Sequence, residues 1–232
     1  MATSGTRTFG FNTEAFDVII EAWERCGRYG SQLSGNDIDS AVRSLSYLMQ
    51  SDWSNRQPNL WTIAQRTEAL VAGQQSFDLE PYDIYITEMA TRQTSGGVNT
   101  DLIIGAMSRS EYLAIPNKAQ QSSRPTQFYL QRTIAPTVFL WPTPQDASIT
   151  IVYNVAQMVE DVGATSNTLD APNRWFDALA AELAARLSLK WARERYAELR
   201  ADADRAYGAA AAEDTENVPM RITPDVWGRR FG

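Results

Sequence analysis

The hydrophobic periodicity of this chain changes twice along its length, and this change limits the folds that it can adopt. Residues 12–54 and 173–208 carry apolar side chains at the three- and four-residue spacing of amphipathic helices. Between them lie short apolar and aromatic runs separated by proline-rich and polar turns, a pattern typical of strands. The sequence therefore predicts an α+β protein in which a β module is inserted between helical segments.

Residues 1–59 predict an N-terminal helical hairpin. Asn12 or Thr13 is expected to cap the first helix, because short polar side chains satisfy the free N–H groups at a helix start. Gly27 is expected to end that helix. The second helix is predicted to begin near residues 34–36, where acidic residues suit the positive end of the helix dipole. The connecting loop is short, so the two helices should pack against each other.

Residues 60–165 predict an inserted β module with seven or eight short strands, arranged as a small sandwich or barrel. Residues 67–79 resemble a hairpin, and Gly96-Gly97 is expected to form the tip of another. Ser108 and Glu111 predict a capped helical turn. The strands are expected at 60–63, 83–89, 102–105, 127–131, 137–141 and 148–155.

Residues 166–212 predict one long C-terminal helix that completes a bundle with the N-terminal hairpin. Asp170 is a candidate cap, and apolar residues follow at helical spacing. A single helix here would reach about 35 residues, or roughly 50 Å at 1.5 Å per residue. A helix of that length is expected to extend past its own core and meet a neighbouring chain.

Residues 213–232 predict an extended C-terminal docking arm, because the helical periodicity ends and prolines favour extended backbone. Chain ends are normally polar, whereas this one carries the residue types that dominate protein interfaces. The candidate docking residues are Trp227, Arg229, Arg230 and Phe231. Two hypotheses stay open for this segment: docking onto another chain, or packing back onto its own core.

The composition excludes most conventional enzyme chemistry. The chain has no histidine and one cysteine, Cys26, which rules out Cys/His zinc sites and catalytic triads that need an imidazole. We find no glycine-rich phosphate-binding loop and predict no catalytic set, cofactor or metal. Cys26 is expected to be a small buried residue.

The charge and hydropathy of the chain limit the classes of partner that it is expected to bind. The net charge of −7 makes it a poor candidate for wrapping DNA, which needs clustered lysines and arginines, but would let DNA slide past. Ordinary solubility is the simpler explanation of the same charge and the one that composition alone favours. No apolar run approaches the roughly 18 residues of a membrane span. The N-terminal residues lack the apolar core of a secretory signal, so we expect the protein to fold where it is made.

The order of helix pair, β insertion, long helix and extended arm resembles the head-to-tail adaptors of short-tailed bacteriophages, also called connector or tubular tail proteins. The resemblance rests on residues 108–113, 124–130 and 140–144, on the helix start at 173–179, and on the end at 224–232. It spans nearly the whole chain, and its motifs are packing and turn residues.

This resemblance implies a structural virion protein located at the head-tail junction and assembled in the cytoplasm of the bacterial host. Such adaptors form a ring, usually of twelve copies, beneath the portal protein. The resemblance implies that the helix from residue 173 lines or braces the DNA channel, and that Trp227, Arg229, Arg230 and Phe231 dock onto the portal. The β module would face a downstream tail or nozzle protein. Genome ejection would then pass DNA through the channel without specific binding.

Two other functions compete with this hypothesis. A hydrolase of the glycosidase type, which we call the hydrolase hypothesis, needs only two carboxylates at a suitable separation. Several acidic and aromatic residues lie close together in the sequence around one β turn and could form such a sugar-binding cleft. Those acidic residues are Asp78, Glu80, Asp83 and Glu88. A free-standing receptor- or carbohydrate-binding phage module would instead be a monomer or trimer with exposed aromatic residues on its β face.

Overall fold

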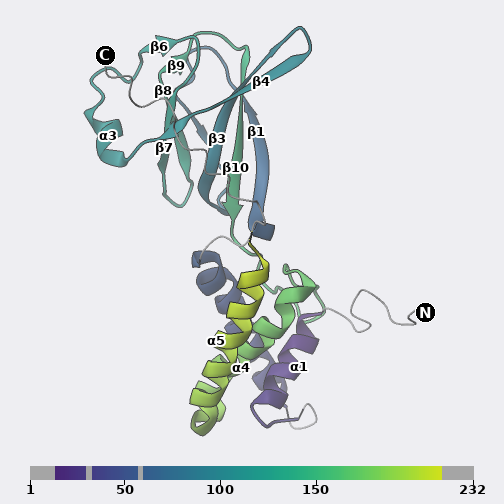
Figure 1. Cartoon of the computed structure of the whole chain (residues 1–232). Coiled ribbons are helices and arrows are strands. Elements are labelled where there is room, and N and C mark those ends of the chain that lie inside the picture. The colour runs from purple at the N-terminus through teal and green to yellow at the C-terminus, as the bar shows by residue number, and fades with distance from the viewer. Residues whose placement is uncertain (1–13, 30–32, 57–59, 216–232) are drawn as a thin grey trace, which may run out of the picture.

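The computed structural model describes residues 14–29, 33–56 and 60–215 and places them in a helical lobe and a β lobe (Figure 1). Two separate hydrophobic clusters form their cores. One unites residues of the first two helices with residues 159–210, and the other lies entirely between Leu70 and Val155. The α+β class and the insertion of strands between helices are confirmed.

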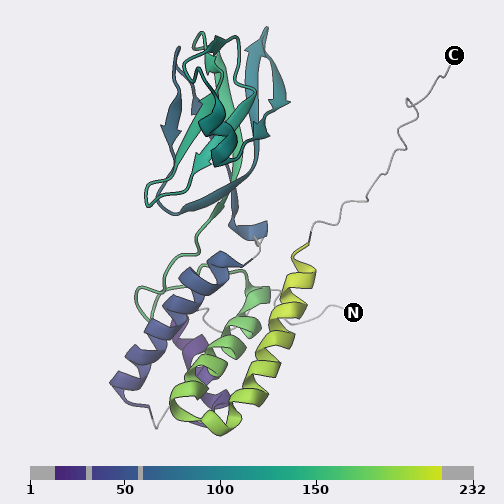
Figure 2. The ribbon, with the colours of Figure 1, turned by 90° about the vertical axis from the view of Figure 1, so that its left-hand side faces the viewer.

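Four helices form the helical lobe, and they pack side by side in two views (Figures 1 and 2). They are α1 (Ala15–Arg25), α2 (Gly35–Tyr47), α4 (Phe176–Trp191) and α5 (Tyr196–Glu213). A π-helical turn (Leu48–Asp52) and a 3-10 turn (Trp53–Asn55) extend α2 toward the β lobe. Trp23, Trp53 and Trp175 are among the largest side chains of this core and are fully buried.

The first helix begins later than predicted, because Glu14 rather than Asn12 or Thr13 holds the N-cap position. Among the described residues, no side chain forms a capping hydrogen bond at this end. The N–H groups of Ala15 and Phe16 instead donate to the carbonyls of Asn167 and Thr165, at 2.9 and 3.0 Å. A distant loop therefore satisfies the donors that a local cap would have taken.

Two other predicted helix ends are confirmed. Gly27 follows α1 with a φ of +81°, and the Arg28 N–H donates to the Trp23 carbonyl at 3.0 Å, which closes the helix. Ser34 caps α2 through a capping box, in which its side chain accepts from the Asp37 N–H and the Asp37 carboxylate accepts from the Ser34 N–H. Local interactions therefore end α1 and begin α2, through the positive φ of Gly27 and the hydrogen bonds of the Ser34 capping box.

The prediction of one long C-terminal helix is wrong. The chain breaks at Ala192, where φ and ψ are −148° and 57°, and a 3-10 turn (Arg193–Arg195) leads into α5, which runs back along α4. Trp191 packs edge-on against Trp23 with ring centroids 4.7 Å apart. Packed together in this way, α4 and α5 bury more apolar surface than a single projecting helix could. Asp170 is not a cap either, since its carboxylate accepts from the Glu160 N–H at 3.1 Å.

The β lobe is a sandwich of two four-stranded sheets, ordered β1-β10-β3-β4 and β2-β8-β7-β5, with a small β6-β9 pair beside them. Residues of both sheets, such as Met89 and Ile151 from one and Phe128 and Leu140 from the other, share one core. The strands are β1 (Ile63–Ala69), β2 (Ser76–Asp78), β3 (Asp83–Ser95), β4 (Val98–Ile103), β5 (Gly105–Ala106), β6 (Gln121–Ser122), β7 (Gln127–Gln131), β8 (Thr137–Trp141), β9 (Thr143–Pro144) and β10 (Ile149–Gln157).

Several predictions for this module are confirmed and two are wrong. The strands at 127–131 and 137–141 match β7 and β8, and Gly96-Gly97 forms the β3–β4 turn with positive φ at both glycines. Residues 60–62, however, form a 3-10 turn rather than a strand. The expected hairpin at 67–79 is absent, because β1 and β2 enter different sheets.

Candidate partner-binding surfaces

Three segments that are separate in the sequence meet on the outer face of the β2-β8-β7-β5 sheet (Figure 2). They are the short helix α3 (Arg109–Ala114), strand β7 and the β8–β9 strands, which contain the motifs at 108–113, 124–130 and 140–144. The ring of Tyr112 stacks on Tyr129 at 5.1 Å and lies 5.2 Å from Phe139. We call these three residues the aromatic cluster. Through this cluster, three motifs that are separate in the sequence contribute to one surface.

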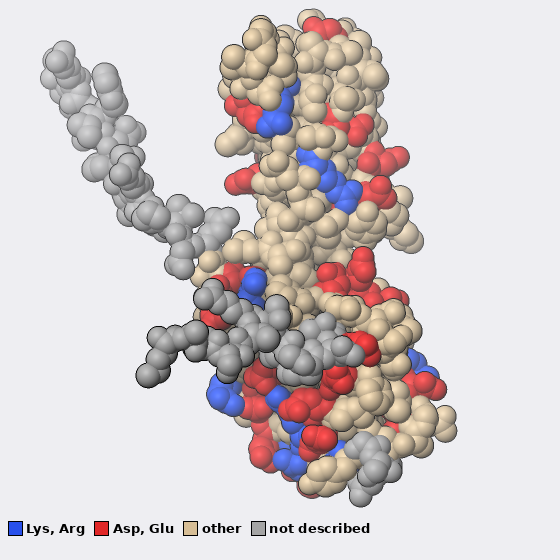
Figure 3. All heavy atoms as spheres, turned by 90° about the vertical axis from the view of Figure 1, so that its right-hand side faces the viewer, with Lys and Arg blue, Asp and Glu red and all other residues tan. Residues whose placement is uncertain are grey.

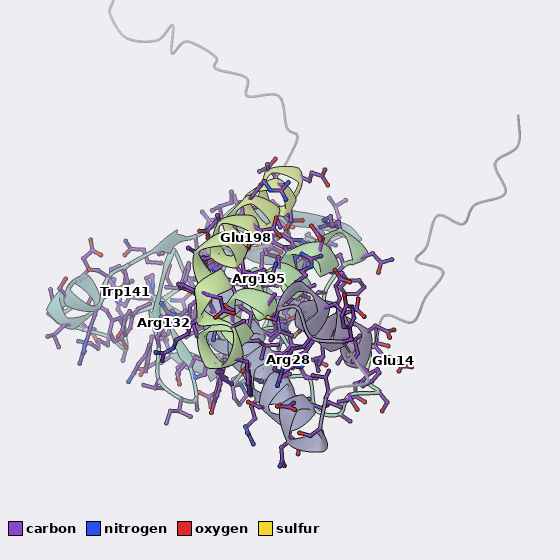
Figure 4. The ribbon with its side chains drawn as sticks, turned by 90° about the horizontal axis from the view of Figure 1, so that it is seen from below. Glu14, Arg28, Arg132, Trp141, Arg195 and Glu198 are labelled. Carbon is purple, nitrogen blue, oxygen red and sulfur yellow. The ribbon has the colours of Figure 1, made fainter. Side chains whose placement is uncertain are left out.

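Local bonds hold α3 against this surface. Ser108 and Glu111 form the predicted capping box, with the Ser108 N–H donating to the Glu111 carboxylate at 2.6 Å. These bonds lower the pKa of Glu111, because they favour its ionised form. The Trp141 indole N–H donates to the Asn117 carbonyl at 3.2 Å, and Figure 4 shows Trp141 beside α3. The loop after α3 is thereby fixed to β8.

The aromatic cluster does not present the open platform that a carbohydrate-binding module uses. Its rings face one another and are only partly exposed, and Lys118 lies over the Tyr112 ring, with its Nζ 5.3 Å from the centroid. Burial raises the pKa of the Tyr112 hydroxyl. A sugar ring would have to displace these contacts to stack there. This geometry does not favour the receptor- or carbohydrate-binding alternative.

Three of the four carboxylates of the hydrolase hypothesis have separate partners, and the fourth, Glu80, lies beside Asp83, to whose carboxylate its N–H donates at 3.2 Å. Asp83 is buried and lies 3.1 Å from the Arg66 guanidinium, whereas Asp78 accepts from the Thr137 hydroxyl at 2.8 Å and Glu88 accepts from the Asn154 amide at 3.3 Å. Burial raises the pKa of Asp83, and the Arg66 charge offsets only part of that shift. Among residues 14–29, 33–56 and 60–215, no group of three His, Cys, Asp or Glu side chains could hold a metal ion.

The charged surface of the lower helical lobe is a mosaic rather than a field of one sign (Figure 3). Asp202 pairs with Arg205, Asp204 pairs with Arg200, and Glu198 lies 3.7 Å from Arg195. Figure 4 shows Arg195 and Glu198 close together on this lobe. The carboxylates of α5 are therefore largely neutralised by neighbouring arginines, and repulsion of DNA by this helix would be weaker than its acidic residues alone imply.

The C-terminal end of α5 is fastened at the junction of the two lobes. Asp214 accepts a hydrogen bond from the Leu60 N–H at 2.9 Å and pairs with Arg174, and its side chain is 4% exposed. Leu60 begins the turn that leads into β1. We call this contact the arm root, because the predicted arm starts beside it. The sequence alone does not single out Asp214, because nothing in the local pattern reveals its distant partners.

The proposed docking residues Trp227, Arg229, Arg230 and Phe231 lie outside the described residues. Cys26 is buried as expected, and its thiol donates to the Ala184 carbonyl at 3.3 Å. Burial raises its pKa to about 11, so this thiol is protonated and unreactive near neutral pH.

Comparison with known families identifies the class of protein. A family model described as SU10 adaptor protein matches residues 17–224. This match spans both lobes and extends past the arm root, so the chain belongs to the SU10 adaptor protein family. Membership makes it a bacteriophage structural protein, a virion component of the adaptor class. No curated protein matches the chain. Within the described part of the chain, no helix is long and apolar enough to cross a membrane.

Proposed function

We propose that this protein is a ring-forming head-to-tail adaptor that docks beneath the portal, extends the DNA channel and recruits tail components. The observation that carries this proposal is the adaptor-family match across residues 17–224. The two-lobed architecture supports it, because a bundle with its own core can form a ring wall while a separate sandwich meets a second partner. Twelve copies are expected from the resemblance of the sequence to known adaptors.

The arm root bears on how the portal would be reached. Asp214 fixes the end of α5 at the lobe junction, the same end of the bundle from which the β lobe departs. If the β lobe faces the tail, the arm must run back past the bundle to reach a portal on the other side. The 18 residues of α5 span about 27 Å. The roughly twelve residues from 216 to 227 reach about 40 Å when fully extended, which is enough.

The first test is the mass of the purified protein by light scattering, alone and with the portal protein of the same phage. We expect either a ring or a monomer that assembles when portal is added. Truncation after Asn217 should abolish the portal complex. A stable monomer or trimer that ignores portal, with the truncation silent, would refute the proposal.

Two further variants separate the length of the arm from its chemistry. Deleting residues 218–223 leaves an arm that reaches about 20 Å before Trp227, shorter than α5, and should abolish portal docking. Replacing the same six residues with glycine and serine keeps the length and should retain docking. The pair Arg229→Ala and Arg230→Ala should weaken docking, whereas the matched Arg221→Ala should not. Equal affinity of all these variants would contradict a role for the arm.

A further inference from the structure

Strand β4 is an open edge of the first sheet. All six of its residues are exposed, including Val98 at 66%, Leu102 at 42% and Ile103 at 86%. Exposed edges with apolar side chains readily pair with strands of another chain, and proteins usually protect them with a bulge, a proline or lysines. In β4 the one charged side chain, Asp101, is engaged by Arg92 at 2.6 Å. The edge is therefore available for pairing.

The register shows which backbone groups of β4 face outward. The Ile104 N–H donates to the Met89 carbonyl at 2.9 Å, so the even-numbered residues of β4 face β3. The N–H and C=O groups of Asn99, Asp101 and Ile103 consequently point away from the sheet. Within the described chain these groups have no other backbone partner.

Strand β1 presents a matching set at the opposite edge of the same sheet. The Leu70 N–H donates to the Ile149 carbonyl at 3.0 Å, so the even-numbered residues of β1 face β10. Ile63, Gln65, Thr67 and Ala69 then direct their backbone groups outward. Because every neighbouring pair in the order β1-β10-β3-β4 is antiparallel, β1 and β4 run in opposite directions.

We infer that β4 of one copy pairs antiparallel with β1 of the next copy, in the register Asn99 with Ala69, Asp101 with Thr67 and Ile103 with Gln65. This register uses all three outward residues of β4 and three of the four outward residues of β1, and it continues the alternation of the sheet. The contact joins two different surfaces, so it repeats head to tail and closes into a ring when the rotation allows. The inference rests on the proposed ring and names one of its subunit contacts. Six residues make a small interface, so the helical lobes must contribute further contacts.

Disulfide trapping tests this pairing in the full chain. In the double variant Thr67→Cys with Asp101→Cys, paired Cα atoms of neighbouring copies would lie about 5.5 Å apart, within disulfide range. Within one copy the same positions are separated by three strand spacings, about 14 Å, and cannot be bridged. Buried Cys26 can stay in place because its thiol is protonated. The control double variant Thr67→Cys with Ile134→Cys places the second cysteine in a turn where Ile134 is 95% exposed, so accessibility does not limit its cross-linking.

Mild oxidation in the presence of portal protein, followed by a non-reducing gel, should give dimers and longer oligomers from the Thr67/Asp101 pair alone. Dimers from the single variant Asp101→Cys would indicate symmetric β4–β4 pairing and overturn the inference. A ring mass by light scattering without cross-links would also overturn it, while leaving the proposed function intact. Absence of both ring and cross-links would overturn the two together.

Discussion

Replacing Glu182 with glutamine should destabilise the helical lobe substantially. Its side chain is 1% exposed and lies on α4, facing the turns that follow α2. It accepts hydrogen bonds from the Trp53 indole N–H at 2.8 Å and from two Arg56 nitrogens at 2.6 and 3.2 Å. Burial opposes the charge on Arg56, but the bonds from Glu182 and Asp52 outweigh it and raise the Arg56 pKa.

The magnitude follows from the bonds that glutamine cannot make. Its single oxygen can keep the Trp53 bond and the 3.2 Å bond from Arg56 Nη2, but its amide then faces Arg56 Nη1, donor against donor, and the charge of the pair is lost. Charge-assisted bonds contribute about 1.5–3 kcal/mol each. Removing one partner of a buried pair costs about 3–5 kcal/mol. Arg56 retains Asp52 and is 22% exposed, so we expect the lower end, about 3 kcal/mol.

Urea unfolding followed by tryptophan fluorescence measures this cost, because Trp23, Trp53 and Trp175 all lie in the helical core. With a slope of about 1.5 kcal/mol/M for a lobe of this size, the Glu182→Gln midpoint should fall by about 2 M. The control Glu198→Gln removes a 73% exposed partner and should change stability by less than about 0.5 kcal/mol. Equal effects of the two substitutions would refute the argument.

Other contacts lead to smaller, local effects. Burial opposes the charge on Asp52, but hydrogen bonds from Arg186 and Arg56 outweigh it and lower the Asp52 pKa. The stabilisation that this carboxylate provides is therefore present above about pH 3.9 and is lost as the pH falls through the folded pKa. Below about pH 4, the urea midpoint of Asp52→Asn should therefore vary less with pH than that of the wild type. Ser108→Ala should destabilise α3 by about 1 kcal/mol and speed its amide exchange, whereas Ser110→Ala should not. Asp214→Asn should speed exchange of the Leu60 amide, and unchanged exchange would show that the arm root does not depend on that charge.

The sequence predicts elements whose signals are local. Ser34 and Ser108 cap helices through chemistry contained within four residues, and Gly96-Gly97 supplies the positive φ that a tight hairpin turn requires. Strand β8 alternates half-buried and buried residues, β7 is a short run of aromatic and apolar residues, and both lie next to proline-containing turns, so their limits are visible in the pattern. These features include all three segments that build the aromatic cluster, namely the Ser108-capped helix α3, β7 and β8.

Features decided by distant partners were not predictable. No glycine or proline marks the break at Ala192. The break forms because α5 can then pack back along α4, which buries apolar side chains of both helices. The pattern at 67–79 predicts a hairpin around Gly73, which does have a positive φ, but a turn alone does not show that β1 and β2 join different sheets. Glu182 and Asp214 resemble surface carboxylates in the sequence, and only the fold brings Arg56 and Arg174 to them.

The β4 edge shows why partner surfaces are the hardest features to predict. The sequence indicated a strand at 102–105, whereas β4 begins at Val98. Alternation of apolar and polar residues arises when one face of a strand is buried, and no residue of β4 is buried. A strand whose partner is another chain need not bury one face within its own chain, so its sequence need not alternate apolar and polar residues. The polar stretch Asn99-Thr100-Asp101 therefore looks like a loop in the sequence, although its backbone forms the edge that we assign to a second copy.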